Sequence, residues 1–309
     1  MIDQSGLVFD RRVVRHHRAR SATMSDQPSA EFLFDQAATD MAERLVVINR
    51  RFQTALVSTA RRGSMAKALR ETGFDGRIFQ ADLCPSMLAQ ANSQATDGGA
   101  FVCDEEFLPF APHTLDLILS PLSLHWLNDL PGALIQMQQA LRPDGLFMGS
   151  LFGGQTLTEL RHVLLEVEAD LMGGASARIS PIIDLRDAAG LLQRAGFNLP
   201  VADADVVEVT YESALDLLRD LRSMGETNAL LRRSRRILPR AFWPTVVERY
   251  ANRFAGLDGR IRATFEIFTL TGWHPHQDQQ KPLRPGSATT RLADRLGTIE
   301  TPTGEKSQN

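Results

Sequence analysis

The chain has 309 residues, a formal net charge of −3 and a pI near 6.2, which argues against a nucleic-acid-binding protein that works by bulk electrostatics. Apolar residues make up 43% and charged residues 23%, so we expect a substantial core rather than global disorder. The two cysteines, Cys84 and Cys103, are too few for a disulfide framework or a metal cluster, so we expect a reducing compartment and no metal site. No apolar run approaches the roughly 18 residues of a membrane-spanning helix.

A basic stretch near the start of the chain, DRRVVRHHRARSA at residues 10–22, contains five arginines and two histidines. The residues alone leave three interpretations open. The stretch is a transit peptide, since such peptides are rich in arginine and serine. Alternatively it is the solvated face of a basic helix, or it contacts an anion or a membrane surface.

The pattern at residues 32–48 predicts an amphipathic helix, and the pattern then alternates between strands and helices up to residue 152. The predicted strands are 54–59, 76–83, 100–105, 114–120 and 146–152, and the predicted helices are 64–74, 85–92 and 130–141, with a turn at 142–145. This alternation indicates a mostly parallel sheet with helices on both faces. In such sheets the ligand binds at the carboxyl ends of the first strands.

The second half of the sequence is less regular. Its predicted helices are 157–172, 184–197, 214–233 and 241–255, and its predicted strands are 201–211 and 260–273. We expect the two strands to pair antiparallel at one edge of the sheet, and the inserted helices to form a cap over the site. The predicted organisation is therefore a helical segment at 1–50, a sheet domain at 51–275 and a loose polar tail at 276–309.

Acidic residues follow two predicted strands. Asp82 closes the second strand, and Asp104 and Glu105 close the third. A carboxylate after the second strand accepts hydrogen bonds from ribose hydroxyls in nucleotide-binding folds, and one after the third suits the exocyclic amine of adenine. The alternative is that Asp82 and Asp104 only cap the helix and turn that follow them.

Two aromatic residues follow the fourth predicted strand, in the stretch SPLSLHWLNDLP at 120–131. His125 suits substrate binding or proton transfer. Trp126 suits an aromatic wall beside a sulfonium cation. The alternative places Trp126 in the core and His125 on the surface.

The loop after the first strand lies in ALVSTARRGSMAKAL at 55–69, where a nucleotide-binding fold carries a glycine-rich turn. Here the turn contains Arg61, Arg62 and a single glycine, Gly63. Arginines at a helix start also suit an anion, because the helix dipole favours negative charge there.

The stretches at residues 101–134 (FVCDEEFLPFAPHTLDLILSPLSLHWLNDLPGAL) and 141–161 (LRPDGLFMGSLFGGQTLTELR) resemble the class I S-adenosylmethionine-dependent methyltransferases of the methyltransferase-11 type. More narrowly, the chain is similar to the respiratory complex I assembly factor 5 family, with relatives among the malonyl-carrier-protein methyltransferases. The similarity begins at FDR (9–11), includes ISP (179–181) and MGETN (224–228), and reaches RPGSAT (284–289). The family's first segment begins at Phe9, so the resemblance favours a bacterial cytoplasmic protein without a presequence; the mitochondrial matrix is the alternative.

The resemblance implies a Rossmann-like α/β fold and S-adenosyl-L-methionine as the cofactor. The cofactor-binding residues that it implies are Gly63, Asp82, Leu83, Asp104, Glu105 and Leu122. The family's first motif is acid-x-Gly-x-Gly-x-Gly, and its four positions here are Val57, Thr59, Arg61 and Gly63. Because the acid and two glycines are replaced, we expect weakened cofactor binding.

The resemblance also implies a protein substrate, modified by methylation or by arginine hydroxylation of a complex I subunit. His125 is the candidate catalytic residue, and Trp126, Asn228 and Trp273 are the candidate substrate residues. The competing hypothesis is a non-catalytic complex I assembly factor whose cofactor loop has degenerated. We expect no nucleic-acid partner and no transmembrane segment, with a peripheral membrane contact through the basic N-terminal stretch.

Overall fold

The computed structural model describes residues 6–24, 31–91, 97–174, 176–280, 295, 297 and 298. The chain divides into two compact units, Met1–Pro275 and His276–Asn309. The sheet and the helices discussed below belong to the first unit. Most of the predicted tail at 276–309, including the RPGSAT stretch at 284–289, lies outside the described residues.

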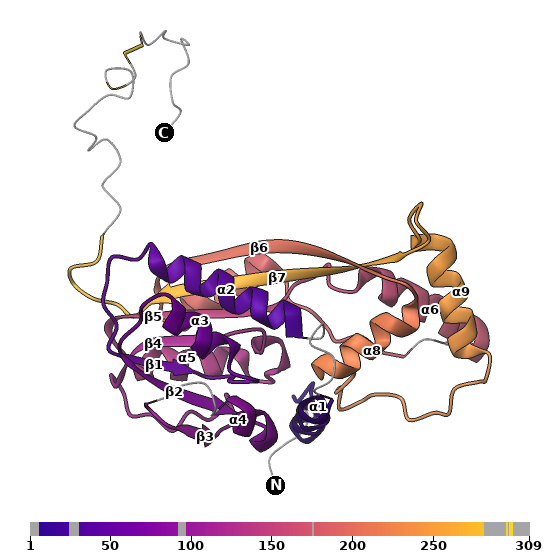
Figure 1. Ribbon diagram of the computed structural model, residues 1–309, viewed down its shortest axis with the longest axis horizontal. Coiled ribbons are helices and arrows are strands. Elements are labelled where there is room, and N and C mark those ends of the chain that lie inside the picture. Colours follow the sequence, from indigo (N-terminus) through magenta and orange to yellow (C-terminus); the bar gives the residue numbers. More distant parts are fainter. Residues whose placement is uncertain are drawn as a thin grey trace. The chain divides into compact units, whose positions relative to one another are not determined.

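In the described part of the chain, seven strands form one sheet in the order β3-β2-β1-β4-β5-β7-β6 (Figure 1). The strands are β1 Thr54–Val57, β2 Arg77–Asp82, β3 Ala100–Val102, β4 Leu115–Ser120, β5 Leu141–Phe152, β6 Asn198–Tyr211 and β7 Ile261–Trp273. Strands β1 to β5 pair in parallel, while β7 runs antiparallel to β5 and β6. The predicted mostly parallel sheet with an antiparallel edge is confirmed. Its order reverses between β1 and β4, so a ligand site is expected beyond their carboxyl ends.

Helices cover both faces of the sheet and extend beyond one end of it. They are α1 Arg11–Thr23, α2 Phe32–Val46, α3 Ser64–Glu71, α4 Pro85–Ala91, α5 Leu130–Ala140, α6 Thr158–Met172, α7 Leu185–Arg194, α8 Ala214–Met224 and α9 Phe242–Phe254. Helices α5 and α7 pack on one face, and α2 and α3 on the other. Helices α6, α8 and α9 surround the extended part of β7 and form the predicted cap (Figure 1).

Strand β5 shows why its sequence forms a central strand. Phe147 and Leu151 face the α5–α7 side, and Leu146 and Met148 face the α2–α3 side. All four are buried, so the strand is apolar on both faces, as parallel strands between two helical layers are.

Two predicted boundaries are wrong. The predicted turn at 142–145 lies inside β5, where the ladder with β4 shifts register and Asp144 adopts a positive φ of 63°. The predicted helix at 214–233 ends at Met224, because Gly225 takes the left-handed conformation that terminates helices.

The basic N-terminal stretch forms α1, which begins where the Asp10 side chain accepts a hydrogen bond from the Val13 amide. Phe9 bridges to Leu230, and the Ser21 hydroxyl donates to the carbonyl of Ser223. These contacts seat α1 between the strand ends and α8 (Figure 1).

Candidate functional site

The loop after β1 has a left-handed backbone at two residues, one of which is an arginine. Arg61 has a φ of 44° and Gly63 a φ of 94°, both in the left-handed region. A residue with a side chain pays a steric penalty there that glycine avoids. This conformation supports the correspondence between Arg61 and a glycine of the family motif.

The Arg61 side chain turns inward. Its guanidinium lies 3.0 Å from Glu31, donates to the Met224 carbonyl at 2.8 Å, and stacks 3.3 Å from the centre of the Phe34 ring. Arg62 donates to the Ser21 carbonyl at 2.8 Å and lies 3.3 Å from Glu31. Both guanidinium groups therefore bind groups of the chain itself, and the structure does not present them as an open anion site.

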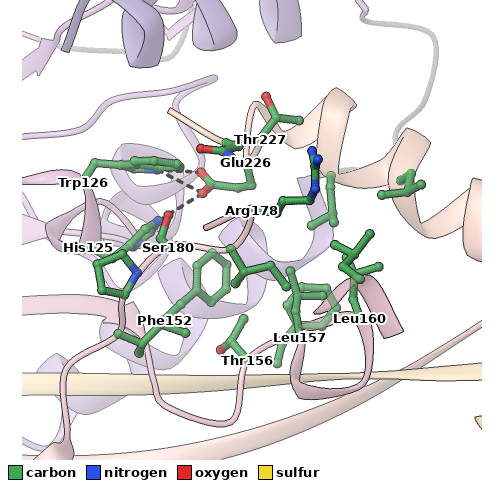
Figure 2. Close-up of a pocket in the computed structure, with 18 of the residues that line it drawn as sticks. His125, Trp126, Phe152, Thr156, Leu157, Leu160, Arg178, Ser180, Glu226 and Thr227 are labelled. Carbon is green, nitrogen blue, oxygen red and sulfur yellow. Dashed lines mark hydrogen bonds and ion pairs between the residues drawn. The ribbon is translucent and has the colours of Figure 1, made fainter. Parts of the chain in front are cut away.

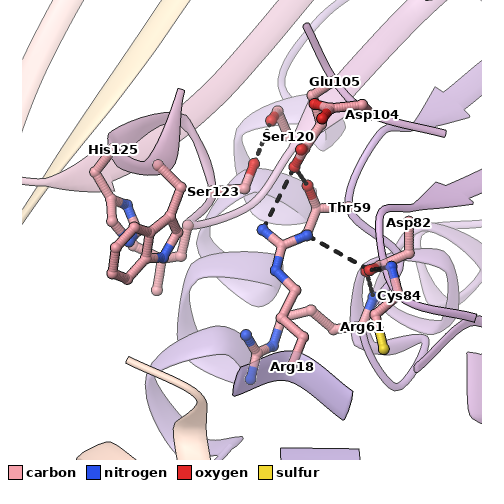
Figure 3. Close-up of polar contacts among 12 residues, drawn as sticks. Arg18, Thr59, Arg61, Asp82, Cys84, Asp104, Glu105, Ser120, Ser123 and His125 are labelled. Carbon is pink, nitrogen blue, oxygen red and sulfur yellow. Dashed lines mark hydrogen bonds and ion pairs between the residues drawn. The ribbon is translucent and has the colours of Figure 1, made fainter. Parts of the chain in front are cut away.

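The three predicted acids meet two arginines of α1 at the carboxyl edge of the sheet. We call Arg11, Arg18, Asp82, Asp104 and Glu105 the arginine–acid cluster. Asp82 is 0% exposed, Glu105 1% and Arg18 2%. Figure 3 shows Arg18 reaching toward the strand ends, between Asp82 on one side and Glu105 on the other.

Each carboxylate oxygen of Asp82 accepts a hydrogen bond. Its Oδ1 accepts from the Cys84 amide at 2.8 Å and from Arg18 at 3.4 Å, and its Oδ2 accepts from the Arg61 amide at 3.0 Å. The two amide contacts come from the loops after β1 and β2. Asp82 therefore holds these two loops together as well as pairing with α1.

Glu105 is bonded just as fully. Its Oε1 accepts from the Thr59 hydroxyl at 2.6 Å and from Arg18 at 3.5 Å, and its Oε2 accepts from Arg11 at 2.7 Å. Arg11 also donates to Asp104 at 2.5 Å. The side chain of Asp104 is the most exposed member of the cluster, at 23%.

The charges within this cluster stabilise one another. Burial alone would raise the pKa of Glu105, but the positive charges of Arg18 and Arg11 and the Thr59 hydrogen bond lower it to about 2. Burial would likewise lower the pKa of Arg18, yet Glu105 and Asp82 raise it above its ordinary value. The Glu105 carboxylate and the Arg18 guanidinium therefore stay ionised inside the protein.

A cavity of about 250 Å³ lies beside this cluster, between the sheet and the cap (Figure 2). At one side of it, Glu226 accepts hydrogen bonds from His125 Nε2 at 3.0 Å and Trp126 Nε1 at 2.9 Å. Burial would raise the pKa of Glu226, but His125 and Arg61 lower it, so its carboxylate is ionised. The apolar walls are Phe152, Leu157, Leu160, Leu164, Ile179, Leu218, Leu221, Trp243 and Phe265.

The structure brings His125, Trp126 and Asn228 together as cavity-lining residues. His125 and Trp126 lie in a 3₁₀ helix, Leu124–Trp126, directly after β4. The Asn228 amide donates to the Ala177 carbonyl at 3.2 Å, and its oxygen accepts from the Leu230 amide. His125 and Trp126 reach the cavity from the end of β4, whereas Asn228 reaches it from the segment after α8.

The other predicted site residues lie in different parts of the fold. Gly63 precedes the first residue of α3, Leu83 packs with Trp126 under α1, and Leu122 is buried in the cap core. Trp273 packs against Phe52 at the opposite end of the sheet. The expectation for Trp273 is corrected: β7 runs antiparallel, so its carboxyl end lies where the parallel strands begin.

Sequence reasoning missed Arg18 and Glu226, which organise the two halves of the site. Arg18 belongs to a basic stretch whose members look alike locally, although Arg12 and Arg15 are exposed and Arg18 is buried. Glu226 follows the glycine that ends α8. A helix predicted over residues 214–233 places Glu226 inside that helix. A helix end predicted at Gly225 would have identified Glu226 as a loop residue beside the site.

Among the described residues, no group of three histidine, cysteine or carboxylate side chains is arranged to hold a metal ion. The helices in the described ranges include none that is both long and apolar enough to cross a membrane. Cys84 and Cys103 are both buried thiols.

Comparison with known proteins defines the class. A methyltransferase domain family matches residues 59–149. Among solved structures, the fold is similar to the YcgJ protein of Bacillus subtilis (TM-score 0.54, 12% identity, 77% of this chain and 98% of that chain). It is also similar to a putative methyltransferase of Bacillus halodurans (TM-score 0.52, 13% identity, 77% and 99%). The fold is that of a Rossmann-like class I methyltransferase.

The relatives narrow this class. The chain is 37% identical to the mitochondrial arginine-hydroxylase NDUFAF5 of Danio rerio, over 95% of this chain and 91% of the relative. It is 37% identical to the Homo sapiens protein of that name, over 97% and 87%. A malonyl-[acyl-carrier protein] O-methyltransferase of Laribacter hongkongensis is 31% identical, over 90% and 94%. The chain belongs to the arginine-hydroxylase NDUFAF5 family.

Membership of the methyltransferase class implies S-adenosyl-L-methionine as cofactor. The acids that would bind it, Asp82 and Glu105, already bind groups of the protein itself. Every carboxylate oxygen of Asp82 and Glu105 accepts a hydrogen bond from the protein. Both side chains are buried beneath α1. In this conformation the residues present do not fit the cofactor.

Proposed function

We propose that this protein binds a segment of another protein, a subunit of respiratory complex I, and modifies an arginine side chain on it. The observation that carries the proposal is the 37% identity to relatives named arginine-hydroxylases over 95% of this chain, cap included. Hydroxylation of the arginine is the modification favoured by these names. Methylation is the modification favoured by the methyltransferase domain match.

The chemistry of the cavity supports an arginine as the group that enters it. An arginine side chain has an apolar stem and a charged planar end, and the cavity pairs leucine and phenylalanine walls with the Glu226 carboxylate. A carboxylate has about four acceptor positions, so Glu226 retains capacity beside His125 and Trp126. Glu226 is therefore our candidate partner for the substrate guanidinium.

His125 is the candidate for contact with the reacting end of that side chain. Its Nε2 hydrogen-bonds to Glu226, while its Nδ1 is buried and has no hydrogen-bond partner among the described residues. Nδ1 is therefore the ring position that remains available to a group of the substrate. Trp126 and Asn228 complete the proposed substrate wall.

A second function is favoured by a specific observation. Asp82 and Glu105, two acids of the family cofactor site, are buried and bonded to α1, which suits a non-catalytic assembly factor that holds an immature complex I subunit. We further propose that cofactor binding is weaker than in relatives with a glycine-rich loop, because Thr59 and Arg61 carry side chains where the motif has glycines.

The exposed Arg12 and Arg15 would support a peripheral membrane contact. We place the protein in the bacterial cytoplasm, with the mitochondrial matrix as the alternative that its relatives' names favour.

Peptide mass spectrometry of complex I subunits tests the two functions. Subunits from cells lacking the protein are compared with subunits from cells expressing the wild type, Glu226→Gln, or the exposed control Glu248→Gln. If the protein modifies arginine, one arginine of a subunit should carry an added oxygen atom or methyl group in cells that express the wild type or the control. The same arginine should be unmodified in cells that express Glu226→Gln. If complex I assembly depends on the protein and no arginine differs, the assembly-factor function replaces the enzyme.

A further inference from the structure

We propose that α1 is an internal occupant of the nucleoside side of this site, so that α1 seated on the sheet and S-adenosyl-L-methionine exclude one another. The inference rests on the arginine–acid cluster and on the class of the fold. It does not depend on which arginine, or whether any arginine, is modified.

The arginine–acid cluster lies where this class of sheet binds its cofactor. Asp82 ends β2 and Thr59 follows β1, next to the point where the strand order reverses. In this class of sheet the cofactor lies across that point, and its ribose hydroxyls bind the acid after the second strand. Arg18 donates to this acid and to Glu105, and Figure 3 shows it between the two. A guanidinium therefore holds the acceptors that a nucleoside needs.

The charge of the arginine–acid cluster also favours a cationic ligand in place of α1. The three carboxylates of the cluster carry a formal charge of −3, and Arg11 and Arg18 reduce it to −1. Without α1, Asp82 and Glu105 would lose their guanidinium partners, a state that favours capture of a cation or of hydrogen-bond donors. S-adenosyl-L-methionine supplies both, because it has a net positive charge, ribose hydroxyls and an exocyclic amine.

The quality of the Arg18 contacts indicates a replaceable occupant. Its guanidinium lies 3.4 Å from Asp82 and 3.5 Å from Glu105, whereas Arg11 lies 2.5 Å from Asp104 and 2.7 Å from Glu105. Charge-assisted hydrogen bonds of this kind are usually about 2.7–2.9 Å long. The Nε of Arg18 is also buried, and no described residue forms a hydrogen bond with it. The hydrogen bonds between Arg18 and the carboxylates of Asp82 and Glu105 are therefore longer than usual, and one donor of Arg18 is not used.

Calorimetric titration with S-adenosyl-L-homocysteine, the demethylated form of the cofactor, tests the proposal on the full chain. The variants are Arg18→Gln and, as a control with the same charge change on the exposed face of α1, Arg15→Gln. We expect Arg18→Gln to bind at least about tenfold more tightly than the wild type, and Arg15→Gln to match the wild type. Adding Asp82→Ala to Arg18→Gln should abolish the binding.

Equal affinity in the wild type and Arg18→Gln overturns the proposal, and so does an absence of binding in both. If Arg18→Gln does not fold, Arg62→Ala replaces it. This change removes the hydrogen bond to the Ser21 carbonyl at the end of α1 and leaves all five members of the cluster in place. It should also tighten binding, and unchanged affinity would count against the proposal. Arginine modification is measured separately by mass spectrometry, so failure of either idea is recognised independently.

Discussion

Arg18, in the first helix, lies 3.4 Å from the carboxylate of Asp82, which ends the second strand 64 residues later. Both side chains are buried, so each compensates a charge that would otherwise be uncompensated inside the protein. The contact therefore links the stability of the fold to the accessibility of the site.

The first prediction concerns this link. Replacing Arg18 by alanine should lower the free energy of unfolding by about 3–5 kcal/mol, because it leaves buried carboxylates without their partner. Replacing the exposed Arg15 by alanine should change it by less than about 0.5 kcal/mol. Urea denaturation followed by circular dichroism measures both. Similar values for the two variants would show that Arg18 is not buried against the acids.

The second prediction concerns the backbone of the loop after β1. Arg61→Ala and Arg61→Gly both remove the contacts to Glu31 and Phe34. Only glycine is relieved of the strain at a φ of 44°, so the glycine variant should be more stable by about 1 kcal/mol. The same denaturation measurement compares them. A more stable alanine variant would contradict the left-handed conformation of this residue.

The third prediction concerns pH. Burial, followed by the charge of Arg20, lowers the pKa of His17 to about 4, from 6.5. The unfolded chain therefore binds more protons between these values, so the His17 contribution to stability is complete above pH 6.5 and is lost as pH falls toward 4. The neutral ring accepts a hydrogen bond from Thr227, whose oxygen accepts one from Arg20.

His17→Asn tests this dependence, since its amide oxygen can accept the Thr227 hydrogen bond without titrating. Unfolding free energies measured from pH 7.5 to pH 4.5 should fall less steeply for the variant than for the wild type. This range avoids most of the Glu105 contribution, which is lost as pH falls from 4.5 toward its folded pKa of about 2. Parallel curves would rule out a neutral buried His17.

The fourth prediction concerns the cavity. Leu160→Trp should fill it and abolish arginine modification in the mass-spectrometric assay, because Leu160 forms part of its wall. Leu165→Trp, on the exposed side of the same helix, is the matched control and should remain active. The thermal midpoint of both proteins confirms that they fold, since overpacking alone can destabilise a core. A folded Leu160→Trp protein with full activity would exclude this cavity as the substrate site.

The sheet could be predicted from the sequence because each of its strands carries a local apolar pattern, as Phe147 and Leu146 illustrate on opposite faces of β5. The acids at 82, 104 and 105 could be predicted because the carboxyl ends of parallel strands share one edge. Trp273 shows the limit of that rule, since it fails for an antiparallel strand. Arg18 could not be identified, because its partners are 64 and 87 residues away and its neighbours in α1 have the same charge.

The most direct test of the central claim, that Arg18 holds α1 over Asp82 and Glu105, is the rate at which a thiol reagent modifies Cys84 in the folded protein. Cys84 is 0% exposed and packs with Ala22 at the end of α1. Modification of Cys84 should be much faster in Arg18→Gln than in the wild type, and unchanged in Arg15→Gln. Equal Cys84 rates in all three folded proteins would contradict the claim.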